Sequence, residues 1–207
     1  MNCHDCHQSC HSKPRGWLWN LLNFRSQKRP EKSFSPHGKN VALVGSPNVG
    51  KSLIFNLLTG TYVTVSNYPG TTVELTEGKA IMAGEKVTFF DTPGMYSMLP
   101  ITEEERVTRD LIINQKMDLM IHVVEAKHLG RMLNLTLQLI ETQLPVILVV
   151  NMIDEAEKLG IYLNENRLMA QLGIPVIFMS AAQKIGLKQL TNQVTHYVQP
   201  TPIPITH

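Results

Sequence analysis

Cysteine is missing from almost the whole chain, because all three Cys lie within the first ten of 207 residues. No disulfide can therefore form in the remainder, which suits a reducing cytoplasm. Long apolar runs are also missing. The longest, 144–150, is short and rich in Val, so it predicts a buried strand rather than a membrane span. The N-terminus has Cys, His and Asp in place of the apolar core of a signal peptide. We expect the chain as given to be soluble.

A large charge excess is absent as well. The formal net charge is +2, and charged residues make up 17% of the chain. A dedicated nucleic-acid-binding protein is usually far more basic, so we expect no nucleic-acid partner. Hydrophobic residues make up 43%, which is enough for a core, and 207 residues fit one α/β domain with tails.

Composition divides the chain into three parts. Residues 1–38 form a Cys/His-rich extension and basic linker, 39–199 form the main domain, and 200–207 form a Pro-rich tail. Within the extension, GWLWNLLNF (16–24) places apolar residues largely on one side of a helix between flanking basic residues. Such a helix lies on a membrane surface or a partner, or packs on its own domain. Both interpretations stay open.

Strand and helix patterns alternate from residue 40 onward. Strands are expected at 40–45, in two segments of 73–91 joined at Ala83-Gly84, and at 117–126, 145–151 and 175–180. Helices are expected at 50–60, 102–115, 129–143, 164–172 and 187–198, the second with Thr102 and Glu105 as a capping box. This alternation predicts an α/β fold with a mainly parallel sheet and helices on both faces. The ligand of such a sheet lies beyond the carboxyl ends of its strands.

A phosphate-binding loop is predicted at GSPNVGKS (45–52), which matches G-x-x-x-x-G-K-[ST] between an expected strand and an expected helix. Its glycines let the backbone N–H groups surround phosphates. Lys51 would reach the β- and γ-phosphates, and Ser52 would bind Mg²⁺. The other residues expected to contact the nucleotide here are Gly45, Pro47, Asn48, Val49, Gly50 and Leu53.

Two further motifs indicate which base is bound. NMID (151–154) directly follows an apolar strand, and Asp154 would accept hydrogen bonds from N1–H and the exocyclic amine of guanine, which adenine cannot match. Asn151 and Met152 belong to the same motif. Backbone N–H groups of the SAA loop would bind the base oxygen, and its residues are Ser180, Ala181 and Ala182. Together the motifs predict a Ras-like P-loop GTPase domain that binds GTP and GDP.

DTPGM (91–95) predicts the loop that senses the γ-phosphate. Asp91 would hold Mg²⁺ through water, the Gly94 N–H would contact the γ-phosphate, and Thr71 or Thr72 would complete the Mg²⁺ shell. Many GTPases follow this glycine with a glutamine that orients the attacking water. Here Met95 stands in that place, so the protein either does not hydrolyse nucleotide or uses another route.

Four segments resemble the cytoplasmic G domain of ferrous iron transport protein B (FeoB), a family of bacterial Fe²⁺ transporters. They are NYPGTTVE, DTPGMYSMLPITEEERVTRD, LNLTLQLIE and VVNMIDEAEKLGI, and the similarity runs from about 40 to 198. The resemblance implies Mg²⁺-dependent GTP hydrolysis that drives or gates ferrous iron uptake, with Thr72 as the switch ligand. It also implies a K⁺ near Asn48 that neutralises developing charge. The catalytic set would be Asn48, Lys51, Thr72 and Gly94.

The resemblance also implies a location and partners. We expect the domain at the cytoplasmic face of the bacterial inner membrane, in contact with a transmembrane iron-permease region that this sequence does not contain. An oligomer formed with the transporter is a further expectation. Two rival functions stay open. One is a GTP-regulated binding module with negligible turnover, and the other is a ribosome- or tRNA-associated GTPase.

The segment CHDCHQSCH (3–11) concentrates thiol and imidazole groups, which suit Zn²⁺ and can bind Fe²⁺. The candidate ligands are Cys3, Cys6, His7 and Cys10. The alternatives are a tail without a specific role and a c-type haem attachment site, whose C-x-x-C-H pattern also matches. His122, in an expected central strand, predicts a core residue rather than a ligand.

Overall fold

The computed structural model describes residues 38–60 and 63–199. The Cys/His segment and the 16–24 helix expected from the sequence lie outside the described residues. In the described part, no helix combines the length and apolarity needed to cross a bilayer.

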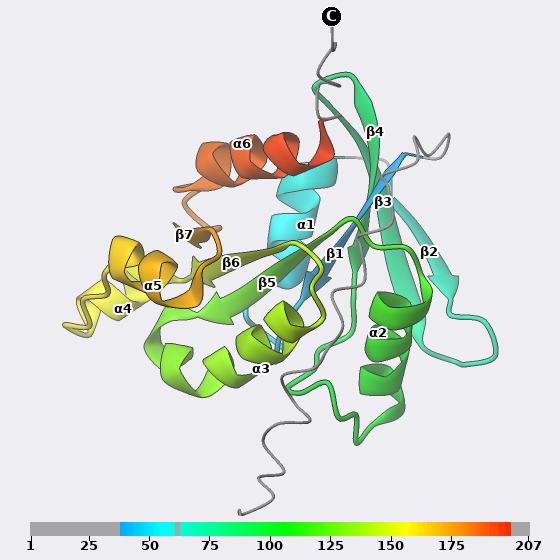
Figure 1. Cartoon of the computed structure of the whole chain (residues 1–207), viewed down its shortest axis with the longest axis horizontal. Coiled ribbons are helices and arrows are strands. Elements are labelled where there is room, and N and C mark those ends of the chain that lie inside the picture. Colours follow the sequence, from blue (N-terminus) through cyan, green and yellow to red (C-terminus); the bar gives the residue numbers. More distant parts are fainter. Residues whose placement is uncertain (1–37, 61–62, 200–207) are drawn as a thin grey trace, which may run out of the picture. The chain divides into compact units, whose positions relative to one another are not determined.

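A seven-stranded sheet forms the centre of the domain, in the order β2-β3-β4-β1-β5-β6-β7 (Figure 1). From β4 to β7 all neighbouring strands pair in parallel, and only β3 runs in the opposite direction. The mainly parallel sheet expected from the sequence is confirmed. The strands are β1 (Lys39–Val44), β2 (Val63–Asn67), β3 (Glu74–Met82), β4 (Glu85–Asp91), β5 (Leu119–Glu125), β6 (Val146–Asn151) and β7 (Val176–Phe178).

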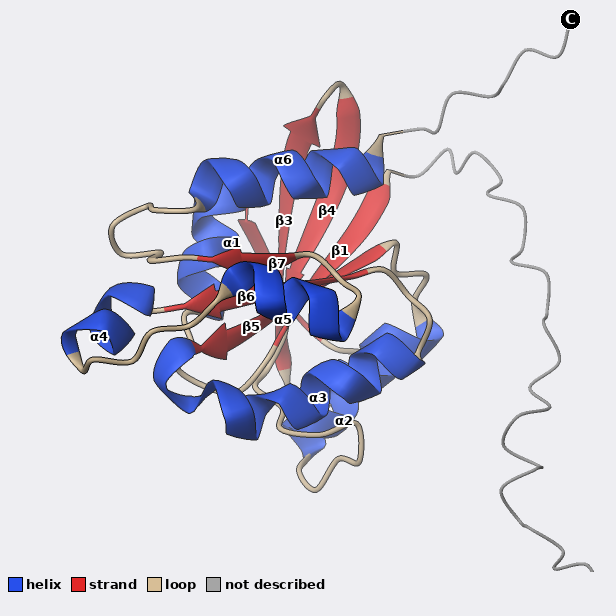
Figure 2. Cartoon of the chain, turned by 60° about the vertical axis from the view of Figure 1, so that its left-hand side comes forward, coloured by secondary structure: helices blue, strands red, loops and turns tan. Residues whose placement is uncertain are grey.

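Helices cover both faces of this sheet, as Figure 2 shows. One face packs against α1 and α6, and the other packs against α2 and α3, with α4 and α5 beside them. A 3-10 turn, η2 (Ala126–His128), leads into α3. The helices are α1 (Lys51–Thr59), α2 (Glu103–Asn114), α3 (Leu129–Glu141), α4 (Ile153–Lys158), α5 (Glu165–Leu172) and α6 (Leu187–Val198).

Successive strand residues supply the two cores in turn. Val41 and Leu43 of β1 pack towards α1 and α6, whereas Ala42 and Val44 pack towards α2 and α3. Every residue of β6 is buried, because a central parallel strand is covered on both faces. His122 of β5 is also buried, and its Nδ1 lies 3.0 Å from the Thr136 hydroxyl, so the prediction of a core residue is confirmed.

Besides the short turn η2, a strand and a helix were not expected from the sequence. All five residues of β2 are exposed at the sheet edge, so no burial pattern marks this strand. The six residues of α4 are too few to show helical periodicity. The hairpin at Ala83-Gly84 is confirmed, with φ angles of 48° and 83° that fit a turn of mirror-image type.

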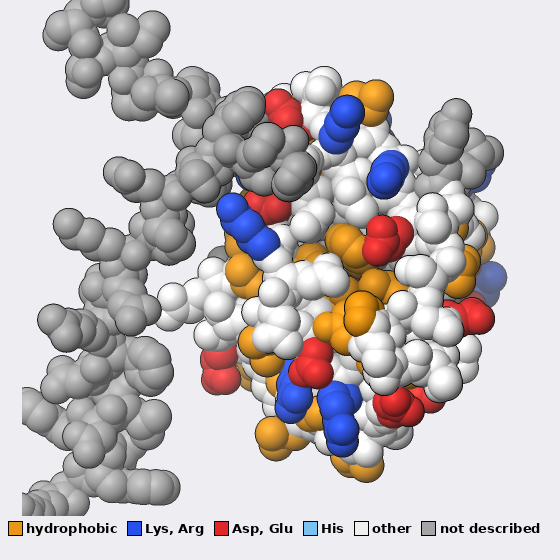
Figure 3. All heavy atoms as spheres, turned by 90° about the vertical axis from the view of Figure 1, so that its right-hand side faces the viewer, with side chains coloured by type: hydrophobic (Ala, Val, Ile, Leu, Met, Phe, Trp, Pro, Cys, Tyr) orange, Lys and Arg blue, Asp and Glu red, His pale blue; other side chains and the backbone are white. Residues whose placement is uncertain are grey.

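The face that lies on the right-hand side of Figure 1 carries β2 and α2, and Figure 3 shows apolar side chains gathered near its middle with charged groups around them. Exposed apolar residues in β2 and in the loop before α2 are Val63, Val65, Leu99 and Ile101.

Candidate functional site

The loop from Gly45 to Gly50 leads from the carboxyl end of β1 into α1. Gly45 and Gly50 have φ angles of 148° and 93°, and Asn48 between them has 64°. A Cβ on Gly45 would lie 2.2 Å from the Val123 carbonyl oxygen, and one on Gly50 would lie 2.4 Å from Asn151 Nδ2. Only glycine fits at these two positions. The loop therefore curls tightly, with the first N–H groups of α1 directed at its concave side.

A buried lysine and a half-buried carboxylate lie next to this loop. Lys51 Nζ donates a hydrogen bond to the Ser46 carbonyl oxygen at 2.9 Å. Burial lowers the pKa of Lys51, and the charge of Asp91 opposes that shift. Burial raises the pKa of Asp91, against the nearby Ser52 hydroxyl and the charge of Lys51. Asp91 Oδ1 is buried without a hydrogen-bond partner. A carboxylate and a hydroxyl close together fit the oxygen ligands that Mg²⁺ prefers.

The DTPG loop lies directly against the phosphate loop. The Met95 N–H donates to the Gly45 carbonyl oxygen at 3.1 Å, and a Cβ on Gly94 would lie 2.5 to 2.8 Å from Pro47 atoms. The Met95 side chain is fully buried in the apolar cluster that includes Leu111 and Met120. It therefore packs in the core and does not face a water at the phosphate loop.

Asn151, at the end of β6, joins two loops. Its Nδ2 donates to the Val49 carbonyl oxygen at 2.9 Å, and its Oδ1 accepts from the Ala181 N–H at 3.0 Å. The side chain is almost fully buried. The phosphate loop and the SAA loop are thus held together by a single amide. The next residue, Met152, takes a φ of 60° where the strand turns into α4.

Asp154 lies in the first turn of α4, near the SAA loop. Its Oδ2 accepts a hydrogen bond from Gln183 Nε2 at 3.1 Å and lies 4.0 Å from Lys158 Nζ. Ser180 is buried and its Oγ has no hydrogen-bond partner, whereas Ala182 is exposed. Gln183 belongs to this group as well, although it was not expected from the sequence. No motif marks it, because it meets Asp154 across 29 positions of the chain.

The two candidate switch threonines differ in their contacts. The Thr71 hydroxyl donates to the Tyr68 carbonyl oxygen at 3.0 Å and accepts from the Val73 N–H at 3.2 Å, so it closes its own turn. Thr72 is exposed. Within residues 38–60 and 63–199, no hydrogen bond joins either threonine to Ser52 or Asp91. Hydrogen bonds join the phosphate, DTPG, NMID and SAA segments, whereas within the described residues the side-chain hydrogen bond of Thr71 stays inside its own loop.

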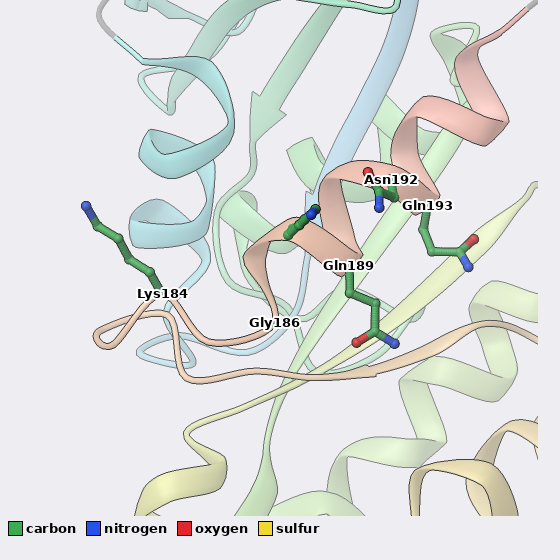
Figure 4. Close-up of a pocket in the computed structure, with 6 residues that line it drawn as sticks. Lys184, Gly186, Gln189, Asn192 and Gln193 are labelled. Atoms are coloured by element: carbon green, nitrogen blue, oxygen red, sulfur yellow. The ribbon is translucent and has the colours of Figure 1, made fainter.

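A surface groove of about 560 Å³ lies elsewhere, at the start of α6 (Figure 4). No residue expected to bind nucleotide lines it. Gln189 and Gln193 extend from α6 on one side, and Lys184 points away from them (Figure 4). The lining residues are Lys184, Gly186, Lys188, Gln189, Asn192 and Gln193.

Comparison with known proteins identifies the family. The family model for ferrous iron transport protein B matches residues 39–194. The chain belongs to the FeoB family. The Fe(2+) transporter FeoB of Escherichia coli K12 is 37% identical over 171 residues, which are 81% of this chain and 22% of that protein. The chain thus spans 22% of the length of this curated FeoB relative.

Solved FeoB structures share the fold. The G domain of T. maritima FeoB superimposes with a TM-score of 0.72 at 38% identity, covering 79% of this chain and all of that one. The cytosolic domain of T. maritima FeoB in its GMPPNP form gives 0.72 at 38% identity, covering 81% and 67%. The described residues therefore form a GTPase-type G domain of the FeoB family, and the Ras-like fold expected from the sequence is confirmed.

Proposed function

We propose that this domain binds and hydrolyses GTP with Mg²⁺ and thereby drives or gates ferrous iron uptake across the bacterial inner membrane. One observation carries the nucleotide site. In the described part of the chain, Asp91 Oδ1 and Ser180 Oγ are the two buried side-chain polar atoms without a partner. Buried polar groups are nearly always satisfied, so two orphans point to a ligand. They lie in the loops expected to hold Mg²⁺ and the base.

The phosphate end of this site would be formed by Lys51, Ser52 and Asp91. The Lys51 ammonium supplies a positive charge that burial has already partly desolvated, so a phosphate gains a strong partner there. Ser52 and Asp91 would hold Mg²⁺, which neutralises the charge of the β- and γ-phosphates. Thr72 would have to move towards them, as switch loops do when a γ-phosphate orders them.

Hydrolysis would proceed without a glutamine. The Gly94 N–H would stabilise the γ-phosphate, together with Lys51. The close approach of Gly94 to Pro47 of the phosphate loop supports this role. Asn48 is exposed at the tip of the phosphate loop, where its side-chain oxygen could hold a K⁺ that stabilises developing charge. The support for this cation is the family resemblance and the position of Asn48.

A turnover experiment tests this proposal. GTP hydrolysis would be measured with Mg²⁺ in K⁺ and in Na⁺ at equal ionic strength, for the wild type and Asn48→Ala. Asn56→Ala, on the exposed side of α1, is the matched control. We expect stimulation by K⁺ in the wild type and the control, and its loss in Asn48→Ala. Equal rates in both salts would contradict the cation-assisted route.

A second candidate function is a GTP-regulated binding module with negligible turnover. The burial of Met95 favours it, because the residue after the DTPG glycine supplies no catalytic side chain. Tight GTP binding with turnover at background in both salts would select this alternative.

Base recognition has its own test. Asp154→Asn exchanges an acceptor for a donor at the guanine edge, so we expect the preference for GTP over ATP to fall by at least about tenfold. Competition between the two nucleotides for a fluorescent GDP analogue measures it. An unchanged preference would remove Asp154 from the base site.

A separate hypothesis concerns metal binding by the extension at residues 1–38. We propose that Cys3, Cys6, His7 and Cys10 bind Fe²⁺ or Zn²⁺ and report cytosolic iron to the domain. Titration of a reduced peptide of residues 1–12 with each metal tests it, and the absence of binding would end it.

A further inference from the structure

We propose that Gln183 is a positioning residue for Asp154, and that its side-chain amide fixes the carboxylate that recognises the guanine edge. This inference rests on the proposed GTP site and adds to it a residue that determines base specificity. The direct observation is the hydrogen bond from Gln183 Nε2 to Asp154 Oδ2 at 3.1 Å.

The loop that carries Gln183 is held firmly. Ser180 and Ile185 exchange two backbone hydrogen bonds of 3.2 and 3.1 Å, and the Gln183 N–H donates to the Ser180 carbonyl oxygen at 3.1 Å. Lys184 takes a φ of 59° to close the turn. Gln183 therefore projects from a closed turn whose backbone hydrogen bonds fix where its amide begins.

The same loop is held from its buried side by Asn151, through the Ala181 N–H. Both polar residues of the NMID motif thus contact one loop, Asn151 from the interior and Asp154 from the surface. The Asn151 bridge places the backbone of the loop. The Asn151 hydrogen bond does not restrict the Asp154 carboxylate, which can still rotate. The hydrogen bond from Gln183 restricts that rotation.

Other groups hold Asp154 less directly. Lys158 Nζ lies 4.0 Å from Oδ2, and its side chain is 74% exposed, so this pair is solvated and weak. Ser180 Oγ makes no hydrogen bond within the described residues. Gln183 is therefore the one side chain of the described part that donates a hydrogen bond to this carboxylate.

The Asp154 carboxylate can accept the hydrogen bond from Gln183 and both hydrogen bonds proposed from guanine. An ionised carboxylate has about four acceptor sites, so one amide on Oδ2 leaves room for both donors of guanine. The final torsion of an Asp side chain is broad, so an unsupported carboxylate must be ordered when the base binds. With Gln183 in place, much of that ordering exists before binding.

The test compares two bases that differ by one donor. Dissociation constants for GDP, IDP and GMP would be measured for the wild type, Gln183→Ala and Gln183→Arg, with Gln193→Ala on α6 as control. IDP lacks the exocyclic amine of GDP. We expect Gln183→Ala to weaken GDP binding by about threefold to tenfold and IDP binding by less. The ratio of GDP affinity to GMP affinity should stay unchanged. Gln183→Arg keeps a donor and should restore the wild-type preference.

A pH profile separates positioning from a merely structural role. Gln183→Glu would place a second carboxylate beside Asp154. We expect its GDP affinity to fall as pH rises through the acid range, where the pair loses its shared proton, while the wild-type profile stays flatter.

Asp154→Asn tells the two possible failures apart. If Asp154→Asn changes the GDP to IDP preference and Gln183→Ala does not, the role of Gln183 is overturned and the guanine site stands. If neither variant changes it, the guanine site itself is overturned, and this inference falls with it.

Discussion

At the residue scale, Lys51 and Asp91 are both held in a place where burial opposes their charged forms. Burial lowers the pKa of the lysine and raises that of the aspartate, and each charge partly corrects the other. Desolvated charges of this kind are typical of functional sites. In this domain they lie on either side of the phosphate loop, where a triphosphate and its cation would supply the missing partners.

Replacing Lys51 tests this pair. Hydrogen bonds to charged groups contribute about 1.5 to 3 kcal/mol, so we expect Lys51→Ala to weaken GDP binding by about tenfold to a hundredfold. Fluorescence titration with a GDP analogue measures the change, and Lys188→Ala, an exposed lysine on α6, is the control. Wild-type affinity in Lys51→Ala would place the phosphates elsewhere.

Some residues could be found from the sequence and others could not. Gly45, Lys51, Asn151 and Asp154 belong to motifs whose spacing reflects a ligand, and the structure gathers them at one end of the sheet. Gln183 has no such spacing, since its partner is distant in the chain and any polar loop residue would look the same.

At the element scale, Glu105 ties the loop after the DTPG motif to α2. Its carboxylate accepts from the backbone N–H groups of Tyr96, Ile101 and Thr102 at 3.2, 2.8 and 3.3 Å, and Thr102 accepts from the Glu105 N–H. The sequence predicted the capping box with Thr102, and the structure confirms it. It could not predict the contacts to Tyr96 and Ile101, which depend on the path of the loop.

These hydrogen bonds make stability depend on pH in a defined direction. The bond from Ile101 is the largest cause that lowers the pKa of Glu105 below its ordinary 4.5, with burial opposing and the bonds from Tyr96 and Thr102 assisting. The contribution to stability is therefore present above pH 4.5 and is lost as pH falls through the lower, folded value.

Glu105→Gln tests that direction. We expect it to lower the free energy of unfolding by about 0.5 to 2 kcal/mol at neutral pH, in the range of lost helix caps. The difference from the wild type should shrink in acid, where the wild-type carboxyl is protonated as well. Urea unfolding at both pH values measures it, with the exposed Glu104→Gln as control. A difference that stays constant with pH would refute the assignment.

Two glycines give opposite predictions for the same substitution. Gly94→Ala would place a methyl group 2.5 Å from Pro47 Cγ. We therefore expect this substitution to separate the DTPG and phosphate loops and to weaken GTP binding more than GDP binding. Gly130→Ala in α3 meets no atom within 4 Å and should raise stability by up to about 1 kcal/mol through helix propensity. Nucleotide titration and thermal unfolding of both variants test the pair. Equal losses of GTP and GDP affinity in Gly94→Ala would contradict it.

The elements missed from the sequence are missed for physical reasons. An edge strand such as β2 faces solvent along its whole length, so its side chains carry no alternation. The short α4 packs Ile153 and Ala156 on the core, which are too few apolar positions to mark a helix in the sequence. Central strands such as β5 and β6 are predictable because burial on both sides requires continuous apolar sequence.

At the scale of the whole molecule, bound nucleotide should stabilise the fold, since the site joins loops that follow β1, β4, β6 and β7. A ligand at about 100 times its Kd adds about 2.7 kcal/mol to the free energy of unfolding. In a domain of this size each kcal/mol raises the melting temperature by about 2 to 4 °C. We expect a rise with GDP and Mg²⁺ and none with ADP. Equal shifts for both would contradict guanine selectivity.

The buried Met95 also limits how this family member could change over evolutionary time. A Met95→Gln substitution would not simply add a water-orienting side chain, because the position belongs to the apolar cluster under α2 and α3. A buried amide without a partner costs about 1 to 3 kcal/mol, so the variant would lose stability before it gained any catalysis. A buried core residue at this position therefore opposes a single-step change to a glutamine-dependent hydrolase, and a water-orienting group would have to come from a cation, a moving loop or a partner.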